Sequence, residues 1–277
     1  MKKTILITGA STGIGKETAI YFANKGWNVA ATMRTPEKEQ VLNKVLNVKL
    51  FCLDVMDEAS ISQAINDTVA AFGGIDVIFN NAGYALVGAF EAMSTENIKR
   101  QFDTNVFGVM NVTRAILPYF RSRKGGLIIN TTSMGGLLTF PLYSVYHSTK
   151  WALEGFMESL QFELRQFNIK VKNIEPGAIK TDFYDRSLDF ATKPGLDAYD
   201  SYVNTAHKNM LKAGENAPGP LVVAKKVFKA ANDNSFTLRY PVGGNGPVLL
   251  AIRWMLPLSW FNAIVRSQVE KGMKRSK

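Results

Sequence analysis

Strand and helix signals alternate along most of this chain, and that alternation limits its possible folds more than any other feature. Short apolar runs bounded by turn residues predict buried strands, and longer segments with apolar residues at helical spacing predict helices. Such alternation implies a parallel sheet with helices on both faces, and right-handed crossovers make the α/β fold doubly wound, or Rossmann-type. The strands are predicted at residues 4–8, 29–33, 48–53, 75–79, 127–130 and 170–174, and the helices at 14–24, 36–45, 57–72, 94–120 and 145–167.

The rest of the chain is less regular but gives no sign of a second domain. It contains no internal repeat, low-complexity segment or linker, so we expect one domain over residues 1–277. Residues 177–219 are polar and aromatic, as an active-site lid would be. The other predicted elements are helices at 198–211 and 221–232, a strand at 237–240 and an extension at 244–277. The extension is expected to cover the substrate cleft or an edge of the body.

The composition is that of a soluble globular protein. Hydrophobic residues make up 46% of the chain and charged residues 20%, which is ample for a core. The single cysteine, Cys52, leaves no intrachain disulfide and no zinc cluster. We therefore expect no metal, and a reducing, cytoplasmic location.

Two further features raise the question of a nucleic-acid or membrane partner. The net charge is +10, but the basic residues are scattered, so we expect a solvated basic surface and no nucleic-acid partner. The most lipid-like stretch, residues 248–265, is interrupted by Arg253 and Pro257. We expect helices packed on the body there, in preference to contact with a membrane surface.

A glycine-rich segment joins the first predicted strand to the first predicted helix. Glycines let the backbone approach a ligand closely, and a helix N-terminus offers free N–H groups to a pyrophosphate. The spacing is G-x-x-x-G-x-G instead of the common G-x-G-x-x-G, but its place between a strand and a helix supports the same function. The candidate cofactor-binding residues are Gly9, Ser11, Thr12, Gly13, Ile14 and Gly15.

The end of the second predicted strand indicates which dinucleotide binds. Asp or Glu at this place binds a ribose 2′-hydroxyl, whereas a basic residue accepts a 2′-phosphate. Here Met33 is followed by Arg34 and no acid is present, so a bidentate, charge-assisted contact is available. We expect NADP(H), with NADPH preferred to NADH. The other interpretation of Arg34 is a solvated surface arginine.

Tyr146 and Lys150 are four residues apart at the start of a predicted helix, so they share one face. A free tyrosine has a pKa of about 10, and a lysine ammonium about 4 Å away can lower it by about three units at an effective dielectric near 20. The pair is a candidate proton donor and acceptor. A second pair of this spacing, Tyr21 and Lys25, is interpreted as part of an ordinary helix. His147 is expected to point off the Tyr146 face.

Six stretches together resemble the short-chain dehydrogenase/reductase family over about residues 4–240. Ser133 precedes Tyr146 by thirteen positions, as the serine of that family does. The stretches are residues 8–15, 80–83, 105–108, Ser133, 146–150 and 176–181. Residues 31–34 and 239–243 look like the branch that contains hydroxysteroid and retinol dehydrogenases.

The resemblance implies a role for each candidate residue. Tyr146 would be the general acid for carbonyl reduction and the general base for alcohol oxidation, with Lys150 lowering its pKa and holding the nicotinamide ribose. Ser133 would stabilise charge on the substrate oxygen. Asn105 would bind a water that links Lys150 to solvent, or is an ordinary helix asparagine. The other implied cofactor contacts are Asp54, Asn81, Ala82, Gly83, Pro176, Gly177, Ile179 and Thr181.

The leading hypothesis is an NADPH-dependent carbonyl reductase or alcohol dehydrogenase for an apolar or aromatic ketone, aldehyde or secondary alcohol. The alternative is a regulatory protein that binds NADPH without turnover. The apolar preference rests on Phe183, Tyr184, Leu188, Phe190, Tyr199, Tyr202, Met134, Leu137, Leu138 and Tyr143. The family resemblance also implies a homodimer or homotetramer, for which Val106, Val109, Ile116, Phe156 and Leu160 could serve, unless they form the core.

Overall fold

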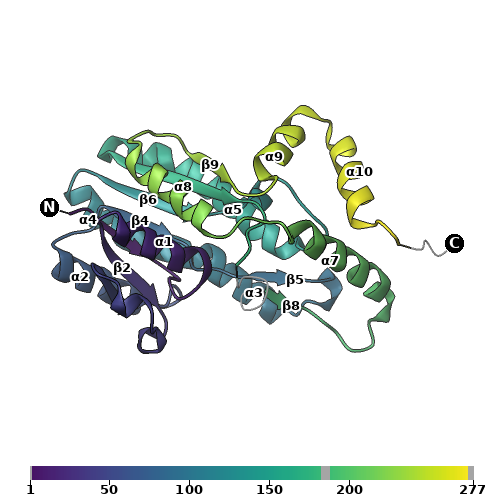
Figure 1. Ribbon diagram of the computed structural model, residues 1–277, viewed down its shortest axis with the longest axis horizontal. Helices are drawn as coiled ribbons and strands as arrows, with labels where there is room; N and C mark the ends of the chain where they lie inside the picture. The colour runs from purple at the N-terminus through teal and green to yellow at the C-terminus, as the bar shows by residue number, and fades with distance from the viewer. Residues whose placement is uncertain (1, 182–187, 274–277) are drawn as a thin grey trace.

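The computed structural model describes residues 2–181 and 188–273 and contains the doubly wound sheet that the alternation predicts. Its strand order is β3-β2-β1-β4-β6-β7-β9, and every neighbouring pair is parallel (Figure 1). The order reverses between β1 and β4, which is where ligands bind in sheets of this kind. The strands are β1 (Thr4–Ile7), β2 (Asn28–Met33), β3 (Val48–Cys52), β4 (Val77–Asn80), β6 (Gly126–Thr131), β7 (Ile169–Pro176) and β9 (Arg239–Val242).

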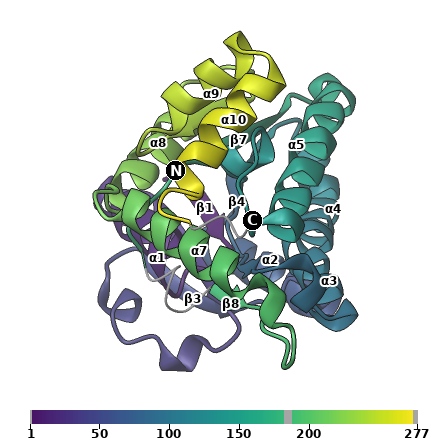
Figure 2. The ribbon, with the colours of Figure 1, turned by 90° about the vertical axis from the view of Figure 1, so that its right-hand side faces the viewer.

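Helices cover both faces of the sheet, which Figure 2 shows from one end. One face carries α1 (Gly13–Asn24) and α8 (Leu221–Asn232), and the other carries α2 (Glu58–Phe72), α4 (Gly108–Ser122) and α5 (Ser144–Leu164).

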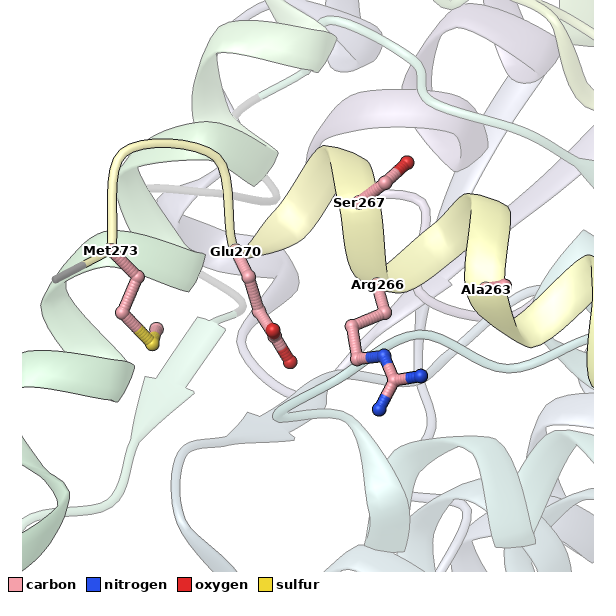
Figure 3. A pocket seen from close by; sticks show the side chains of 5 residues that line it. All are labelled: Ala263, Arg266, Ser267, Glu270 and Met273. Carbon is pink, nitrogen blue, oxygen red and sulfur yellow. The ribbon is translucent and has the colours of Figure 1, made fainter. Parts of the chain in front are cut away.

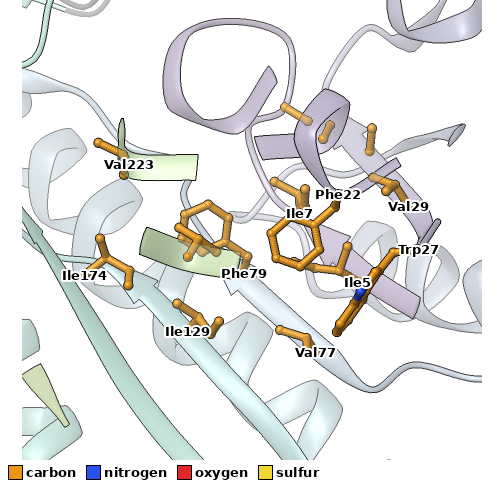
Figure 4. Packing of buried hydrophobic residues seen from close by; sticks show 14 of the residues in the cluster. Ile5, Ile7, Phe22, Trp27, Val29, Val77, Phe79, Ile129, Ile174 and Val223 are labelled. Atoms are coloured by element: carbon orange, nitrogen blue, oxygen red, sulfur yellow. The ribbon is translucent and has the colours of Figure 1, made fainter. Parts of the chain in front are cut away.

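Side chains alternate between these two layers along each central strand. Ile5 and Ile7 of β1 pack with α1 and α8, while Leu6 packs on the other side. Figure 4 shows the first layer, where Phe22 and Trp27 meet edge to face with ring centroids 5.1 Å apart. Burial on both faces accounts for the nearly continuous apolar strands of the sequence.

The helix predicted at residues 36–45 is not formed. Two short 3₁₀ turns, Pro36–Lys38 and Leu42–Lys44, take its place. The Glu39 carboxylate accepts hydrogen bonds from the backbone N–H groups of Val41 and Leu42, at 2.8 and 3.0 Å. Those donors would bond to carbonyl groups four residues earlier in a continuous helix, so the side chain competes with the helix and interrupts it.

The long helix predicted at residues 94–120 is interrupted in its middle. It consists of α3 (Thr95–Phe102), a π-helical turn over Asp103–Phe107, and α4. Such turns insert an extra residue and often occur at functional sites. The turn holds Asn105, one of the predicted site residues.

The same helices show which candidate dimer residues belong to the core. Val106, Val109, Ile116 and Leu160 are buried within this chain, and Phe156 packs against the same cluster. The structure therefore supports the interpretation that these side chains form part of the core.

The C-terminal third covers the carboxyl edge of the sheet. β5 (Ala85–Val87) pairs with β8 (Leu188–Phe190) in a small second sheet that the sequence did not predict. α7 (Asp200–Gly214) lies close to the helix predicted at 198–211, and α9 (Gly246–Met255) and α10 (Leu258–Val269) follow β9.

Among the described residues, no helix is long and apolar enough to cross a membrane.

Candidate active site

Many of the predicted site residues gather at the carboxyl edge of the sheet, because they follow the ends of parallel strands. The glycine-rich loop follows β1, Arg34 follows β2 and Asp54 follows β3. Asn81 follows β4 and Ser133 follows β6. The sheet thus brings together residues that are far apart in the sequence.

The glycine-rich loop is packed too tightly for side chains at two of its glycines. A Cβ on Gly9, whose φ is +65°, would lie 2.8 Å from the Cα of Ala82. A Cβ on Gly15 would lie 2.4 Å from the Gly9 carbonyl oxygen and 2.6 Å from Asn81 Nδ2. These contacts are closer than real Cβ atoms allow, so both positions require glycine.

The start of α1 provides a place for an anion. Its N-cap residue, Thr12, makes no side-chain capping bond, so the first N–H groups of the helix are left available to a ligand. Thr181 lies beside this turn, since a Cβ on Gly13 would be 3.7 Å from its Cβ. The residues present therefore fit the pyrophosphate of a dinucleotide.

Asn81 fixes the loop to two neighbouring strands. Its Nδ2 donates to the carbonyl oxygens of Thr8 and Gly9, both at 3.1 Å, and its Oδ1 accepts from Thr131 Oγ1 at 3.2 Å. Thr8 Oγ1 accepts from the backbone N–H groups of Asn81 and Ala82. The side chain of Asn81 thus holds the cofactor loop in shape.

The ends of β2 and β3 lie side by side at the outer part of this edge. Arg34 is exposed, and its carbonyl oxygen accepts from Cys52 Sγ at 3.4 Å. Asp54 Oδ1 accepts from the backbone N–H of Met56 at 3.0 Å. Within the described part of the chain, the Arg34 guanidinium forms no ion pair, so it can contact an anionic ligand.

Lys150 is buried beneath Tyr146 on the first turns of α5. Its side chain is 6% exposed, and Nζ lies 5.6 Å from the centre of the Tyr146 ring. Nζ donates to the carbonyl oxygen of Thr131 at 2.8 Å. Burial lowers the pKa of Lys150 to about 8, while the nearby Glu154 carboxylate acts in the opposite direction. The lysine therefore still carries its charge at neutral pH.

Ser133 begins the short turn that follows β6. Its Oγ accepts from the backbone N–H of Gly135 at 3.0 Å and lies 3.5 Å from the carbonyl oxygen of Pro176. Gly177 is held in turn by a backbone bond to Val242 at 2.8 Å, and Ile179 is buried beside Gly243. The ends of β6 and β7 are thus connected at this side of the site.

Asn105 holds the start of α5 to the loop after β4. Its Nδ2 donates to the Tyr84 carbonyl oxygen at 2.9 Å and to Thr149 Oγ1 at 3.3 Å, and its Oδ1 accepts from the Tyr84 N–H at 3.1 Å. A Cβ on Gly83 would lie 3.0 Å from Asn105 Oδ1, so a larger residue here would require the Asn105 side chain to shift. One lone pair of that oxygen remains for a further donor. The predicted water link stays a prediction.

His147 is a structural residue in this arrangement. It is buried, its ring stacks on Tyr143, and its Nδ1 accepts from the Phe140 N–H at 3.3 Å. Burial lowers the pKa of His147 to about 4, so the imidazole is neutral at physiological pH.

Apolar side chains from four segments surround the Tyr146 ring. Tyr146 and Tyr143 belong to one cluster with residues of β5, β8, α7 and α10. Its members are Ala85, Val87, Leu142, Tyr143, Tyr146, Leu188, Phe190, Tyr202, Val203, Ala206, Val265 and Val269. Met134, Leu137 and Leu138 form a neighbouring cluster with α9 and α10. Tyr199 is exposed, and Phe183 and Tyr184 lie outside the described residues.

The C-terminal helices therefore pack beside Tyr146 and Met134, and their individual contacts could not be predicted from the sequence. α10 also lines a polar cavity of about 370 Å³, towards which Arg266 and Glu270 point in Figure 3. Ala263, Ser267 and Met273 complete its lining.

A buried polar network that the sequence did not reveal lies behind Lys150. Asn80, Asn130 and Asn173 stand side by side on β4, β6 and β7, and their amides form a hydrogen-bonded row. Asn173 Nδ2 donates to Glu154 Oε2 at 3.0 Å. The row thus connects the centre of the sheet to α5, one turn beyond Lys150.

Arg239 joins this network to a second buried carboxylate. Its Nε lies 3.2 Å from Glu154 Oε2 and 3.5 Å from Glu175 Oε1, and it also pairs with the exposed Glu158. Burial and the nearby Glu154 raise the pKa of Glu175 to about 8, against the opposing effect of Arg239. Glu175 is therefore protonated at neutral pH. No spacing motif in the sequence marks these residues, which come from three separate elements.

Comparison with known proteins gives consistent matches. A family profile described as short chain dehydrogenase matches residues 3–190. The chain is 38% identical to an uncharacterized oxidoreductase of Bacillus subtilis, YusZ, over 97% of this chain and 99% of that protein. It is 35% identical to 3-ketodihydrosphingosine reductase of Bacteroides thetaiotaomicron, over 89% and 90%. It is 36% identical to human retinol dehydrogenase 8, over 77% and 74%.

Solved structures of similar proteins share the whole architecture. A short-chain dehydrogenase from Streptomyces avermitilis matches with a TM-score of 0.82 and 32% identity, over 99% of this chain and 100% of that chain. A structure of ElxO with NADP bound matches with a TM-score of 0.74 and 29% identity, over 90% and 100%. A 3-ketoacyl-(acyl-carrier-protein) reductase from Brucella melitensis, complexed with NADH, gives 0.73 and 25%, over 87% and 96%.

Proposed function

The chain belongs to the short-chain dehydrogenase family, and from that premise we propose that it is an NADPH-dependent reductase of apolar ketones or aldehydes, which also oxidises the corresponding alcohols. The observation that carries the proposal is the buried Lys150 beneath Tyr146, within an apolar cluster next to the dinucleotide loop. When bound, NADPH supplies the hydride. This chain then has to bind the carbonyl, orient it and supply a proton.

Tyr146 is the proposed proton donor to the carbonyl oxygen. The positive charge of Lys150 favours the phenolate that remains after proton transfer. The bond from Lys150 Nζ to Thr131 holds that charge in place. Ser133 Oγ, at the end of β6, is the proposed donor to the same carbonyl oxygen.

The preference for NADPH rests on the end of β2. Arg34 is exposed directly after Met33, and neither residue is acidic, so the position offers a donor to a 2′-phosphate and no acceptor for a 2′-hydroxyl. The structure of ElxO with NADP bound is consistent with this preference, while the reductase from Brucella melitensis holds NADH. Because the similar structures hold either cofactor, the preference of this chain depends on the residues at the end of β2.

Replacing Arg34 by alanine is expected to lower kcat/KM for NADPH by about 10- to 100-fold and to leave the value for NADH nearly unchanged. A hydrogen bond to a charged group contributes about 1.5–3 kcal/mol, which is lost only with the phosphorylated cofactor. Steady-state rates with both cofactors measure the ratio. The matched control is Arg114→Ala, which removes an exposed arginine on α4. An unchanged NADPH/NADH ratio in the Arg34 variant would refute the assignment.

The proposed substrate class follows from the walls around Tyr146. The side chains there are aliphatic and aromatic, and a site of that composition binds an apolar ligand and orients it through a few polar groups. Relatives named for 3-ketodihydrosphingosine and for retinol are in line with this class.

A panel of carbonyl compounds tests the substrate class. Bulky apolar ketones and aldehydes are expected to be reduced with a higher kcat/KM than small charged keto acids, because a charged group would lose its hydration against these walls without a partner. Loss of NADPH absorbance gives the rates. Faster reduction of the keto acids would overturn this part of the proposal.

A further inference from the structure

The α9–α10 hairpin, residues 246–269, projects from the body of the protein. Figures 1 and 2 both show its two helices rising away from the sheet, with the junction between them at the outermost point. Leu256 and Pro257 form that junction. Because the tip stands clear of the body, no other element among the described residues covers it.

The two sides of the hairpin differ in what they contact. Leu250, Phe261 and Val269 are buried and pack on the clusters around Tyr146 and Met134. The tip instead exposes four large apolar side chains, which we call the apical patch. They are Trp254, Met255, Leu258 and Trp260, with exposed fractions of 76%, 74%, 52% and 64%. Soluble monomers rarely expose such a concentration of large apolar groups without a binding partner.

The charges around the apical patch are of one sign. Between residues 234 and 269 the sequence contains no Asp or Glu, and Arg253 and Arg266 are the basic residues of the hairpin. Arg253 lies next to Trp254 and over the ring of Phe261, 5.9 Å from its centre. Arg253 is thus the charged residue beside the tip, so the tip complements a negatively charged partner.

We propose that the apical patch docks onto an anionic lipid membrane surface. Tryptophan favours the boundary between lipid and water, and an apolar face flanked by arginine and lysine is typical of segments that lie in that boundary. The helices have 10 and 12 residues, about 15 and 18 Å in length, so the tip enters the headgroup region without crossing the bilayer. The sequence alone favoured packing of this segment on the body, and the structure shows that only its inner side does so.

Docking of this kind would connect the bilayer to the proposed active site through α10. This helix runs about 18 Å from the tip to Val269, and its inner side contributes Val265 and Val269 to the cluster around Tyr146. An apolar substrate dissolved in the membrane would thus reach the site along the inner side of the hairpin. This consequence rests on the proposed function, whereas the docking itself does not.

Vesicle binding tests the proposal without using catalytic activity. The full-length protein is sedimented with phosphatidylcholine vesicles, with and without phosphatidylserine, at low and high salt. The double variant Trp254→Ser/Trp260→Ser is compared with Leu46→Ser/Phe90→Ser, which removes two exposed apolar side chains far from the hairpin in sequence. Wild type and control are expected to bind the phosphatidylserine vesicles, and the tryptophan variant to bind them at least about tenfold more weakly.

Three results would overturn the proposal. The first is equal binding of the tryptophan variant and the control, and the second is no binding of the wild type to either vesicle at low salt. The third is a wild-type oligomer that dissociates in the tryptophan variant, since a second copy of this chain would then be what covers the patch. Because both tryptophans are exposed, the thermal midpoint is expected to be unchanged, which shows that the variant is folded.

Discussion

Replacing Tyr146 by phenylalanine is expected to lower kcat for carbonyl reduction by about 10²- to 10⁴-fold, while NADPH still binds. A positioned proton donor contributes about 10²–10⁴ in rate, and phenylalanine has no proton to give. The ring itself stays, so the contacts with Tyr143 and Lys150 in the apolar cluster are retained. The rate is measured from NADPH absorbance, and binding from the change in NADPH fluorescence.

The chain offers a matched control for this experiment. Tyr21 on α1 and Lys25, the residue that caps its C-terminus, have the same spacing, and Lys25 Nζ also lies 5.6 Å from the tyrosine ring centre. Tyr21→Phe is expected to leave kcat unchanged, since α1 places this pair against α8, away from the carboxyl edge. Turnover by Tyr146→Phe at the wild-type rate would contradict the assignment of the proton donor. Loss of NADPH binding in that variant would mean that the tyrosine acts mainly in cofactor binding.

Replacing Glu175 by glutamine is expected to stabilise the protein at alkaline pH and to have little effect near pH 4.5. Burial raises the pKa of Glu175 from 4.5 to about 8, so folding takes up a proton between these values. The contribution of this group to the free energy of unfolding is therefore fully present below about pH 4.5 and is lost as the pH rises towards 8. Glutamine is never ionised, so the variant escapes that loss, which is about 4–5 kcal/mol at pH 8.5 at about 1.36 kcal/mol per pKa unit.

Urea unfolding at several pH values measures this difference. Glu158→Gln is the matched control, because Glu158 pairs with the same arginine, Arg239, but is exposed to solvent. Its free energy of unfolding is expected to follow that of the wild type within about 1 kcal/mol at every pH. Parallel curves for the wild type and Glu175→Gln would mean that the buried carboxyl is ionised across the whole range.

The parts of the fold that local sequence determines could be predicted. The alternation of strands and helices, with the turn chemistry at Asp57 and Gly73, gave α2 and its neighbours nearly at their observed bounds. The glycine-rich loop could also be predicted. Gly9 lies so close to Ala82, and Gly15 so close to Asn81, that only glycine fits at these two positions. These features could be predicted because each depends on neighbouring residues in the sequence or on a position that accepts one residue type.

The features that depend on distant contacts could not be predicted. The segment at 36–45 had a helical pattern, but the buried Glu39 carboxylate, held by Lys16 from α1, takes up the donors of that helix. The pairing of β5 with β8 joins two strands of three residues that are about a hundred positions apart in the sequence. Likewise, Glu154 and Glu175 look like ordinary helix and strand residues until the fold places both beside Arg239.

The central claim is that this chain transfers a hydride from NADPH to the carbonyl carbon of an apolar substrate. The most direct test is to supply NADPH that carries deuterium at the transferring C4 position, together with an apolar ketone, and to analyse the product by mass spectrometry. We expect an alcohol with one deuterium on its carbinol carbon. NADPH that binds but is not consumed with any apolar ketone or aldehyde would contradict this reaction and favour a protein that binds the cofactor without turnover.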